Sequence, residues 1–218
     1  MLETILNIFS AKKRKNRIQI LAENIGFSLS AEWDYSLDHD LQDFTFSEMD
    51  KTRSASYNVL SAVRDGARWK IFDRNGSRLG GLRPIFRFQT MIFVELADVA
   101  LGNPGYLGHY FITPKSAIGS LCMKFKRKKA GDARVYHVRD TPTGSFFVVA
   151  ESKSDLEGIP KGLWDALGRD KKKRYSVEVL RKSALFYRVN KVISARDIPA
   201  FFNDVLQFVN FFKGRTAA

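Results

Sequence analysis

Hydrophobic residues recur at helical spacing at both ends of the chain. Near the N-terminus they stand three or four positions apart as far as Gly26, a residue that commonly ends helices. A broad apolar stripe near the C-terminus has the same spacing. The patterns predict one or two helices over residues 2–25 and a helix over residues 195–212 that packs on a sheet. The positions are Leu2, Ile5, Leu6, Phe9, Ile18, Leu21, Ala22 and Ile25, then Ile198, Phe201, Phe202, Val205, Phe208, Val209 and Phe212.

Between these helices, apolar and alternating runs predict strands. They cover residues 57–64, 67–73, 85–96, 110–113, 134–139, 146–151, 175–180 and 185–192. Asn75-Gly76 is the strongest short hairpin signal and predicts a turn. Residues 26–53 lack clear periodicity, which predicts a long irregular connection or an edge strand. With a further helix at 160–167, the chain reads as an α+β fold of antiparallel sheets packed against helices, with a ββα–ββα arrangement in its C-terminal half.

Breaks in the pattern suggest how the chain is organised. A Gly- and Pro-rich passage at residues 101–119 is the expected waist of the molecule. We therefore divide the chain into an amphipathic, basic helical segment at 1–25, a β-rich unit at 26–120 and a ββαββα unit at 121–218. The last two units could equally form a single compact domain.

Charge narrows the classes of partner. Lys and Arg number 36 against 23 Asp and Glu, a formal net charge of +13, which favours anionic partners. An acidic stretch at residues 32–50 contains neither Lys nor Arg, so the surface should be polarised. The basic residues gather in three clusters: Lys12, Lys13, Arg14, Lys15 and Arg17; Lys124, Lys126, Arg127, Lys128 and Lys129; Arg169, Lys171, Lys172, Lys173 and Arg174.

The N-terminal segment resembles a short interfacial anchor, in which apolar turns enter the headgroup region and basic residues meet anionic lipid. The alternative is a helix that packs on its own domain and presents a solvated basic face. The candidate docking residues are Leu2, Ile5, Leu6, Phe9, Lys12, Lys13, Arg14, Lys15 and Arg17.

Composition also points to a compartment. No run of eighteen apolar residues is present, and the basic residues follow the apolar ones, the reverse of a secretory signal peptide. The one cysteine, Cys122, cannot form an internal disulfide, which favours a reducing environment. We expect a cytoplasmic protein, peripheral on the cytoplasmic face of the inner membrane.

Residues suited to catalysis are sparse. The three histidines, His39, His109 and His137, fall in no recognised catalytic signature, and Cys122 lies in an apolar stretch. The glycines of segment 76–81 precede another strand, so they do not form a phosphate-binding loop. We expect a protein that is not an enzyme, with no catalytic residue, metal, cofactor or small-molecule substrate.

Five dipeptides stand out along the predicted strands. Through them the chain, over roughly residues 24–212, resembles a widespread family of uncharacterised bacterial α+β proteins. The resemblance implies an α+β fold without a known activity, and its members are often membrane-associated or carry a spanning segment, which this chain lacks. The dipeptides are Phe72-Asp73, Gln89-Thr90, Thr113-Pro114, Val177-Glu178 and Tyr187-Arg188.

The sequence thus favours a non-catalytic binding or scaffold protein, a peripheral accessory subunit. Its partner would be a membrane-protein complex or an anionic lipid surface, reached through the N-terminal segment and the basic face. The alternative is sequence-nonspecific binding of nucleic acid by the same charges, since no base-reading motif is present. In either case the anion-binding residues would be Lys124, Lys126, Arg127, Lys128, Lys129, Arg169, Lys171, Lys172, Lys173 and Arg174.

Overall fold

The computed structural model describes residues 2–30, 35–44, 55–80, 83–97, 107–115, 134–169, 174–189 and 191–213. Within these ranges the fold is mixed α+β, with more strand than helix. One antiparallel sheet of nine strands has the order β1-β2-β3-β4-β9-β8-β5-β7-β6. The strands are β1 (Ser28–Ser30), β2 (Ala55–Arg64), β3 (Ala67–Gly80), β4 (Arg83–Leu96), β5 (His109–Pro114), β6 (Val135–Thr141), β7 (Gly144–Ala150), β8 (Ser176–Leu180) and β9 (Ser183–Tyr187).

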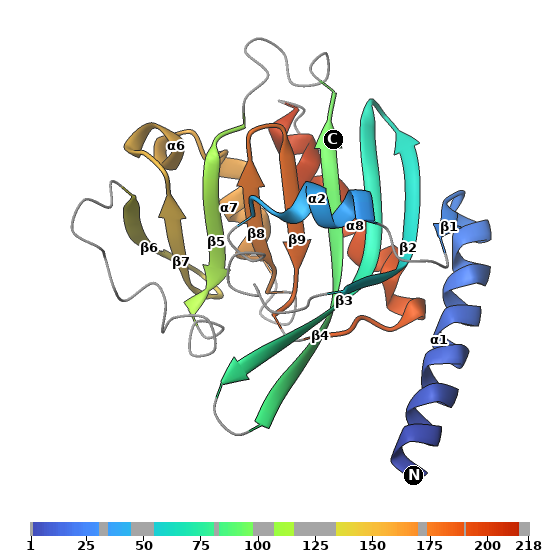
Figure 1. Ribbon diagram of the computed structural model, residues 1–218. Coiled ribbons are helices and arrows are strands. Elements are labelled where there is room, and N and C mark those ends of the chain that lie inside the picture. Colours follow the sequence, from blue (N-terminus) through green and yellow to red (C-terminus); the bar gives the residue numbers. More distant parts are fainter. Residues whose placement is uncertain are drawn as a thin grey trace.

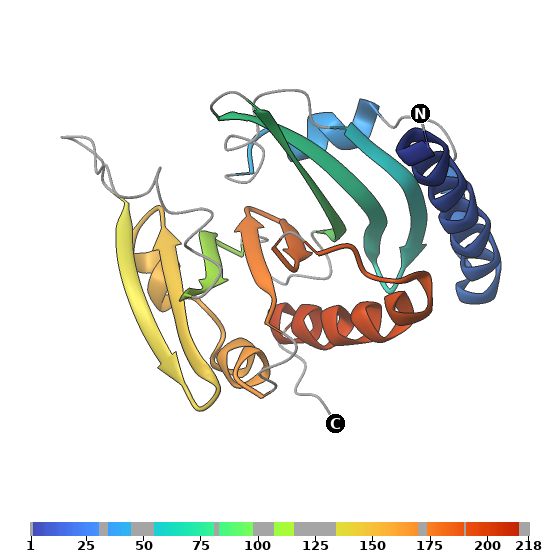
Figure 2. The ribbon, with the colours of Figure 1, turned by 90° about the horizontal axis from the view of Figure 1, so that it is seen from below.

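Helices cover both faces of this sheet (Figures 1 and 2). Side chains alternate between the faces along a strand, so Trp69 and Ile71 join the larger apolar cluster while Phe72 joins the smaller one on the other face. Residues of α1, α7 and α8 belong to the larger cluster, and residues of α2 to the smaller. The helical segments are α1 (Leu2–Ile25), α2 (Tyr35–Leu41), α6 (Lys153–Glu157), α7 (Lys161–Leu167), the 3-10 turn η2 (Ala195–Asp197) and α8 (Ile198–Phe212).

Both predicted terminal helices are confirmed. All seven apolar positions of the C-terminal stripe are buried in α8, where Phe202 meets Trp69 edge-on at 5.0 Å and Phe201 stacks on Tyr175 at 5.2 Å. Helix α1 is continuous and ends before Gly26, which adopts a left-handed φ of 70°. The next amide, that of Phe27, donates to the carbonyl of Ala22 at 2.9 Å and closes the helix.

One local prediction was wrong, and another was confirmed only in part. Asn75-Gly76 forms no turn: both residues lie inside β3, whose pairing with β4 runs unbroken from Ala67 to Gly80. Long-range strand pairing here overrides a local turn preference. The segment expected to be irregular contains the edge strand β1 and also the helix α2, which its weak periodicity did not predict.

One sheet draws strands from both sides of residue 120. Strand β4 pairs with β9, and β5 lies between β8 and β7. The C-terminal half runs β6, β7, α6, α7, β8, β9, η2 and α8 along the chain. The division into units and the ββα–ββα description stay predictions.

The close approach of α7 and α8 gives a test of the core. A Cβ on Gly162 would lie 2.5 Å from Cδ1 of Phe211. We expect Gly162→Ala to lower the free energy of unfolding by about 1–2 kcal/mol, because overpacking exceeds the gain in helix propensity. In a Phe211→Ala background the same change should stabilise the protein. Urea denaturation of the four proteins measures both effects, and an equal effect in both backgrounds would refute this packing.

Candidate functional site

A buried ion pair fastens α1 to the sheet. The Arg14 guanidinium donates from Nε to Asp73 Oδ2 at 2.7 Å and from Nη2 to Oδ1 at 2.6 Å. The Asp73 side chain is 2% exposed and that of Arg14 is 20% exposed. The third guanidinium nitrogen, Nη1, donates to the carbonyl of Ile193 at 2.8 Å. This two-pronged geometry is the strong form of a charged hydrogen bond, and it connects α1, β3 and the segment before η2.

A second layer of hydrogen bonds completes this network. Thr90 donates its hydroxyl to Asp73 Oδ1 at 2.7 Å and accepts from the amide of Ile193 at 2.9 Å. Asn58 donates to Asp73 Oδ2 at 3.0 Å from a bulge in β2, where its φ is 54°. The carboxylate thereby accepts four hydrogen bonds, about its full capacity. Asp73 and Thr90, members of two of the dipeptides singled out in the sequence, face each other across β3 and β4.

The acidic segment is likewise used inside the fold. Asp38 on α2 pairs with Arg74 at 3.2 Å, and Asp40 pairs with Arg68 at 3.2 Å and Lys70 at 3.6 Å. These ion pairs and the buried Leu37 and Leu41 hold α2 against the sheet. His39, between the two aspartates, is exposed. The acidic residues of α2 therefore neutralise cations of β3.

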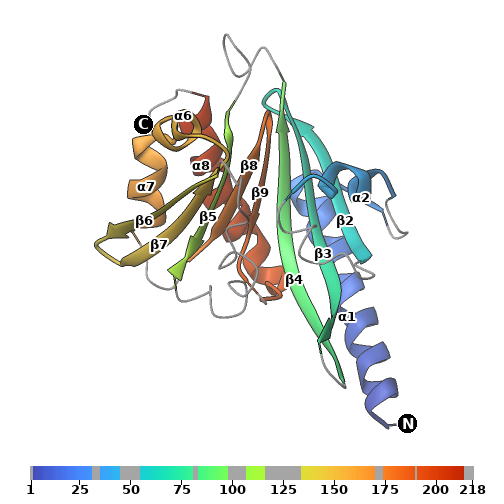
Figure 3. The ribbon, with the colours of Figure 1, turned by 60° about the vertical axis from the view of Figure 1, so that its left-hand side comes forward.

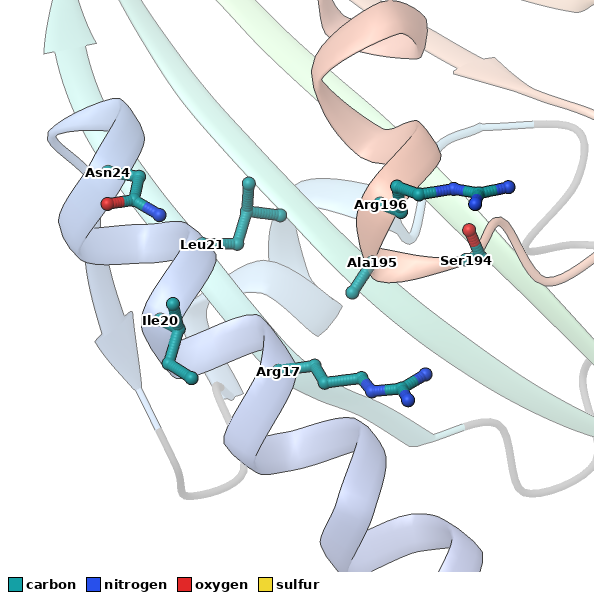
Figure 4. Close-up of a pocket in the computed structure, with 7 residues that line it drawn as sticks. All are labelled: Arg17, Ile20, Leu21, Asn24, Ser194, Ala195 and Arg196. Atoms are coloured by element: carbon teal, nitrogen blue, oxygen red, sulfur yellow. The ribbon is translucent and has the colours of Figure 1, made fainter.

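A groove lies between α1 and η2 (Figure 4), with a volume of about 570 Å³. Its described lining includes two arginines, one from each wall, and no carboxylate. In Figure 4, Arg17 extends from α1 toward the turn that holds Ser194 and Ala195. Ile20 is 60% exposed and Arg196 has a side chain that is 92% exposed. The lining residues are Arg17, Ile20, Leu21, Asn24, Ser194, Ala195 and Arg196.

The predicted docking residues separate into three groups. Lys13, Lys15 and Arg17 are exposed on α1, and Arg17 lines the groove. Arg14 uses its charge inside the fold, so it does not belong to a docking surface. Side chains of Leu2, Ile5, Leu6, Phe9 and Lys12 lie outside the described part of the structure, although the helical backbone of these residues is included.

Most of the other predicted anion-binding residues also fall outside the described ranges. Among those within them, Arg169 is exposed, and Arg174 donates to the carbonyl of Thr143. A second groove, of about 450 Å³, includes Arg169 together with Arg139, whose guanidinium lies 5.0 Å from the Trp164 ring. Asp140 and Asp165 also line it and balance its charge. The residues not covered are Lys124, Lys126, Arg127, Lys128, Lys129, Lys171, Lys172 and Lys173.

The histidines are scattered over the fold. His109 on β5 has Nδ1 at 3.5 Å from Glu151, and His137 is exposed on the edge strand β6. Across the described residues, no three His, Cys, Asp or Glu side chains form a group that could hold a metal. No described helix is long and apolar enough to cross a membrane. Cys122 lies outside the described ranges.

The groove residues Ile20, Ser194 and Arg196 were not predicted from the sequence. A signal for Ile20 was present, because on a helix it faces away from the apolar positions 18, 21 and 25. Nothing local marks Arg196, whose role depends on η2 lying beside α1.

The ion pair predicts a large loss of stability on mutation. Arg14→Gln leaves the buried Asp73 carboxylate without its cation and should lower the free energy of unfolding by about 3 kcal/mol. The exposed neighbour provides a control, since Lys13→Gln should change it by less than about 0.5 kcal/mol. Adding Asp73→Asn to Arg14→Gln should recover part of the loss in denaturant titrations. Strictly additive effects would argue against direct coupling.

The same network predicts a stability change at high pH. Burial, and then the Asp73 carboxylate, raise the pKa of Tyr57 to about 12, while Arg14 opposes them. An unfolded tyrosine ionises near pH 10, so between about pH 10 and 12 the unfolded chain loses a proton that the folded protein keeps. The free energy of unfolding should fall across that window and be unaffected by this group below it. Tyr57→Phe should flatten the fall in urea titrations, and an unchanged slope would contradict the assignment.

No family model matches this chain, and no curated protein sequence matches it. Among solved structures, its fold is similar to the crystal structure of the mycobacterial trehalose monomycolate transport factor A, TtfA. The TM-score is 0.58, the sequences are 12% identical, and the match covers 92% of each chain. At this identity the likeness shows a shared fold alone.

Proposed function

We propose that this protein is a non-catalytic accessory protein that docks on the cytoplasmic side of a membrane or membrane-protein complex through the outward face of α1. The observation that carries this proposal is a change of apolar face along a single continuous helix.

The C-terminal half of α1 belongs to the body of the protein. Ile18, Leu21 and Ala22 are buried in the larger apolar cluster, Ile25 packs against it, and Arg14 is held by Asp73. These positions recur every three or four residues, so they define one face of the helix. That face is the one fixed to the sheet.

The opposite face points outward. Lys13, Arg17, Ile20 and Asn24 are exposed and also recur at helical spacing. At about 3.6 residues per turn, position 2 lies about five full turns before Ile20 and therefore on the same face of the helix. Positions 6 and 9 follow position 2 at helical spacing, which keeps them on that face. The apolar residues of the N-terminal half thus occupy positions on the outward face, opposite to the face that the other half buries.

The backbone supports docking through this face. The N-terminal half of α1 extends past β1 and β2, at the end of the molecule where β3 and β4 also project (Figures 1 and 3). A helix with apolar positions on opposite faces in its two halves has one apolar side used by its own core and another suited to a second surface. Apolar residues followed by Lys12, Lys13, Lys15 and Arg17 match the chemistry of an anionic membrane interface.

The fold neighbour adds support by analogy. TtfA is named as a transport factor, and an accessory role beside a transport system is consistent with that name. We carry over to this chain only the class of role. The proposed location is peripheral, on the cytoplasmic face of the inner membrane.

Truncation of residues 2–10 tests this function. A tagged chain that lacks these residues should no longer be found in the membrane fraction of the cells that produce it, because the apolar positions of the outward face are lost. The body should keep its cooperative unfolding transition, since the ion pair of Arg14 and the buried half of α1 remain. Sedimentation of nuclease-treated membranes measures the bound fraction.

Single substitutions sharpen the test. Leu6→Gln on the outward face should weaken association by about tenfold, the cost of losing one buried leucine. Ile8→Gln removes an aliphatic side chain of the same size from a position about 100° away from position 9 around the helix, so it should weaken association less. Retention of the truncated chain on membranes would refute docking through α1, and release of the intact chain by nuclease would favour nucleic acid instead.

A further inference from the structure

We propose that the groove between α1 and η2 is a site for anionic lipid, in which a phosphate headgroup of the membrane surface lies between Arg17 and Arg196. This inference rests on the docking proposed for α1, and it goes further by naming the chemistry of the surface and the side chains that contact it.

The charge of the groove selects an anion. Arg17 and Arg196 come from opposite walls, and the described lining includes no carboxylate. Asp197 stands next to Arg196, with Arg196 Nε at 3.7 Å from its Oδ1, but its other oxygen accepts from the Ser194 hydroxyl at 2.7 Å. Exposed Lys13 and Lys191 flank the arginines along the chain. On the other wall, exposed Glu23 stands next to Asn24, so four cations face two neighbouring carboxylates.

Exposed apolar side chains accompany these cations. Across the described residues, four large hydrophobic side chains are exposed: Ile20, Val63, Val138 and Val192. Ile20 lines the groove, and Val192, 39% exposed, lies two residues before Ser194. Aliphatic side chains among cations are typical of surfaces that enter the headgroup region, whereas the binding of a soluble anion does not require them. This pairing favours a lipid surface over an isolated phosphate.

The groove also lies on the face that the proposed function presents to the membrane. Arg17, Ile20 and Asn24 line the groove and belong to the outward face of α1. A surface that meets positions 2, 6 and 9 would therefore meet these residues as well. The Arg14 bond to the Ile193 carbonyl, at 2.8 Å, holds the second wall beside α1, so the backbone of both walls is in place before any lipid arrives.

Vesicle binding by the purified full-length protein tests the site. The double variant Arg17→Gln/Arg196→Gln should bind phosphatidylglycerol-containing vesicles about 10- to 30-fold more weakly than the parent protein, since each surface cation contributes about fivefold. Its urea denaturation should be unchanged, because neither side chain takes part in the Arg14 network. Vesicles of phosphatidylcholine alone should bind both proteins weakly, and added salt should reduce the difference between the proteins.

A matched control removes the same charge elsewhere. Arg64→Gln/Lys161→Gln changes two exposed cations outside the groove and should alter binding by less than the groove variant does. Equal losses in both variants would overturn the site in favour of general electrostatic attraction.

Other outcomes separate this inference from the proposed function. If the groove variant binds vesicles normally while truncation of residues 2–10 releases the protein from cell membranes, the lipid site is wrong and docking through α1 stands. If the groove variant no longer binds native membranes but still binds protein-free vesicles, the occupant of the groove is an acidic segment of a partner protein and the lipid assignment is wrong. If the truncated chain stays on cell membranes, the proposed function fails.

Discussion

The rest of the structure depends on how one buried carboxylate is satisfied. Asp73 lies in the interior of the fold, where an unpaired charge would cost several kcal/mol. Arg14, Asn58 and Thr90 together supply the four hydrogen bonds that it needs. Each donor comes from a different element, so satisfying Asp73 fixes the positions of α1, β2 and β4 around β3. Through the carbonyl of Ile193, the same arginine also sets the entry to η2 and α8.

Charge is divided between the fold and the surface. Arg14, Arg68 and Arg74 pair with carboxylates of β3 and α2, which uses several acidic residues internally. In the sequence, the acidic stretch indicated one pole of a polarised surface. In the structure, part of this stretch instead helps to hold α2 against the sheet. The net charge of +13 is consequently carried by other basic residues, and Arg17 and Arg196 are two that reach the surface.

Periodicity made the helices and most strands predictable, because burial of one face leaves a regular trace in the sequence. The same reasoning failed where distant partners decide local structure. Asn75-Gly76 became strand because β4 pairs with it, and α2 became helix because Arg74, Lys70 and two buried leucines hold it. For the site, the cationic face of α1 was predictable from the sequence. The internal role of Arg14 and the contribution of Arg196 to the groove depend on contacts between distant parts of the chain, which only the folded structure shows.

The two faces of α1 separate the folding of the body from the docking that we propose. If the apolar positions of the N-terminal half shared the face of Ile18 and Leu21, the whole helix could lie on the body and present only polar residues. Those positions fall instead on the opposite face of the helix, while the buried half and Arg14 keep the helix from rotating. A rigid link of this kind limits the orientational freedom lost on binding, which improves affinity without new contacts. Under the proposed docking, the stability of the body and the affinity for a surface thus rest on different residues of one helix.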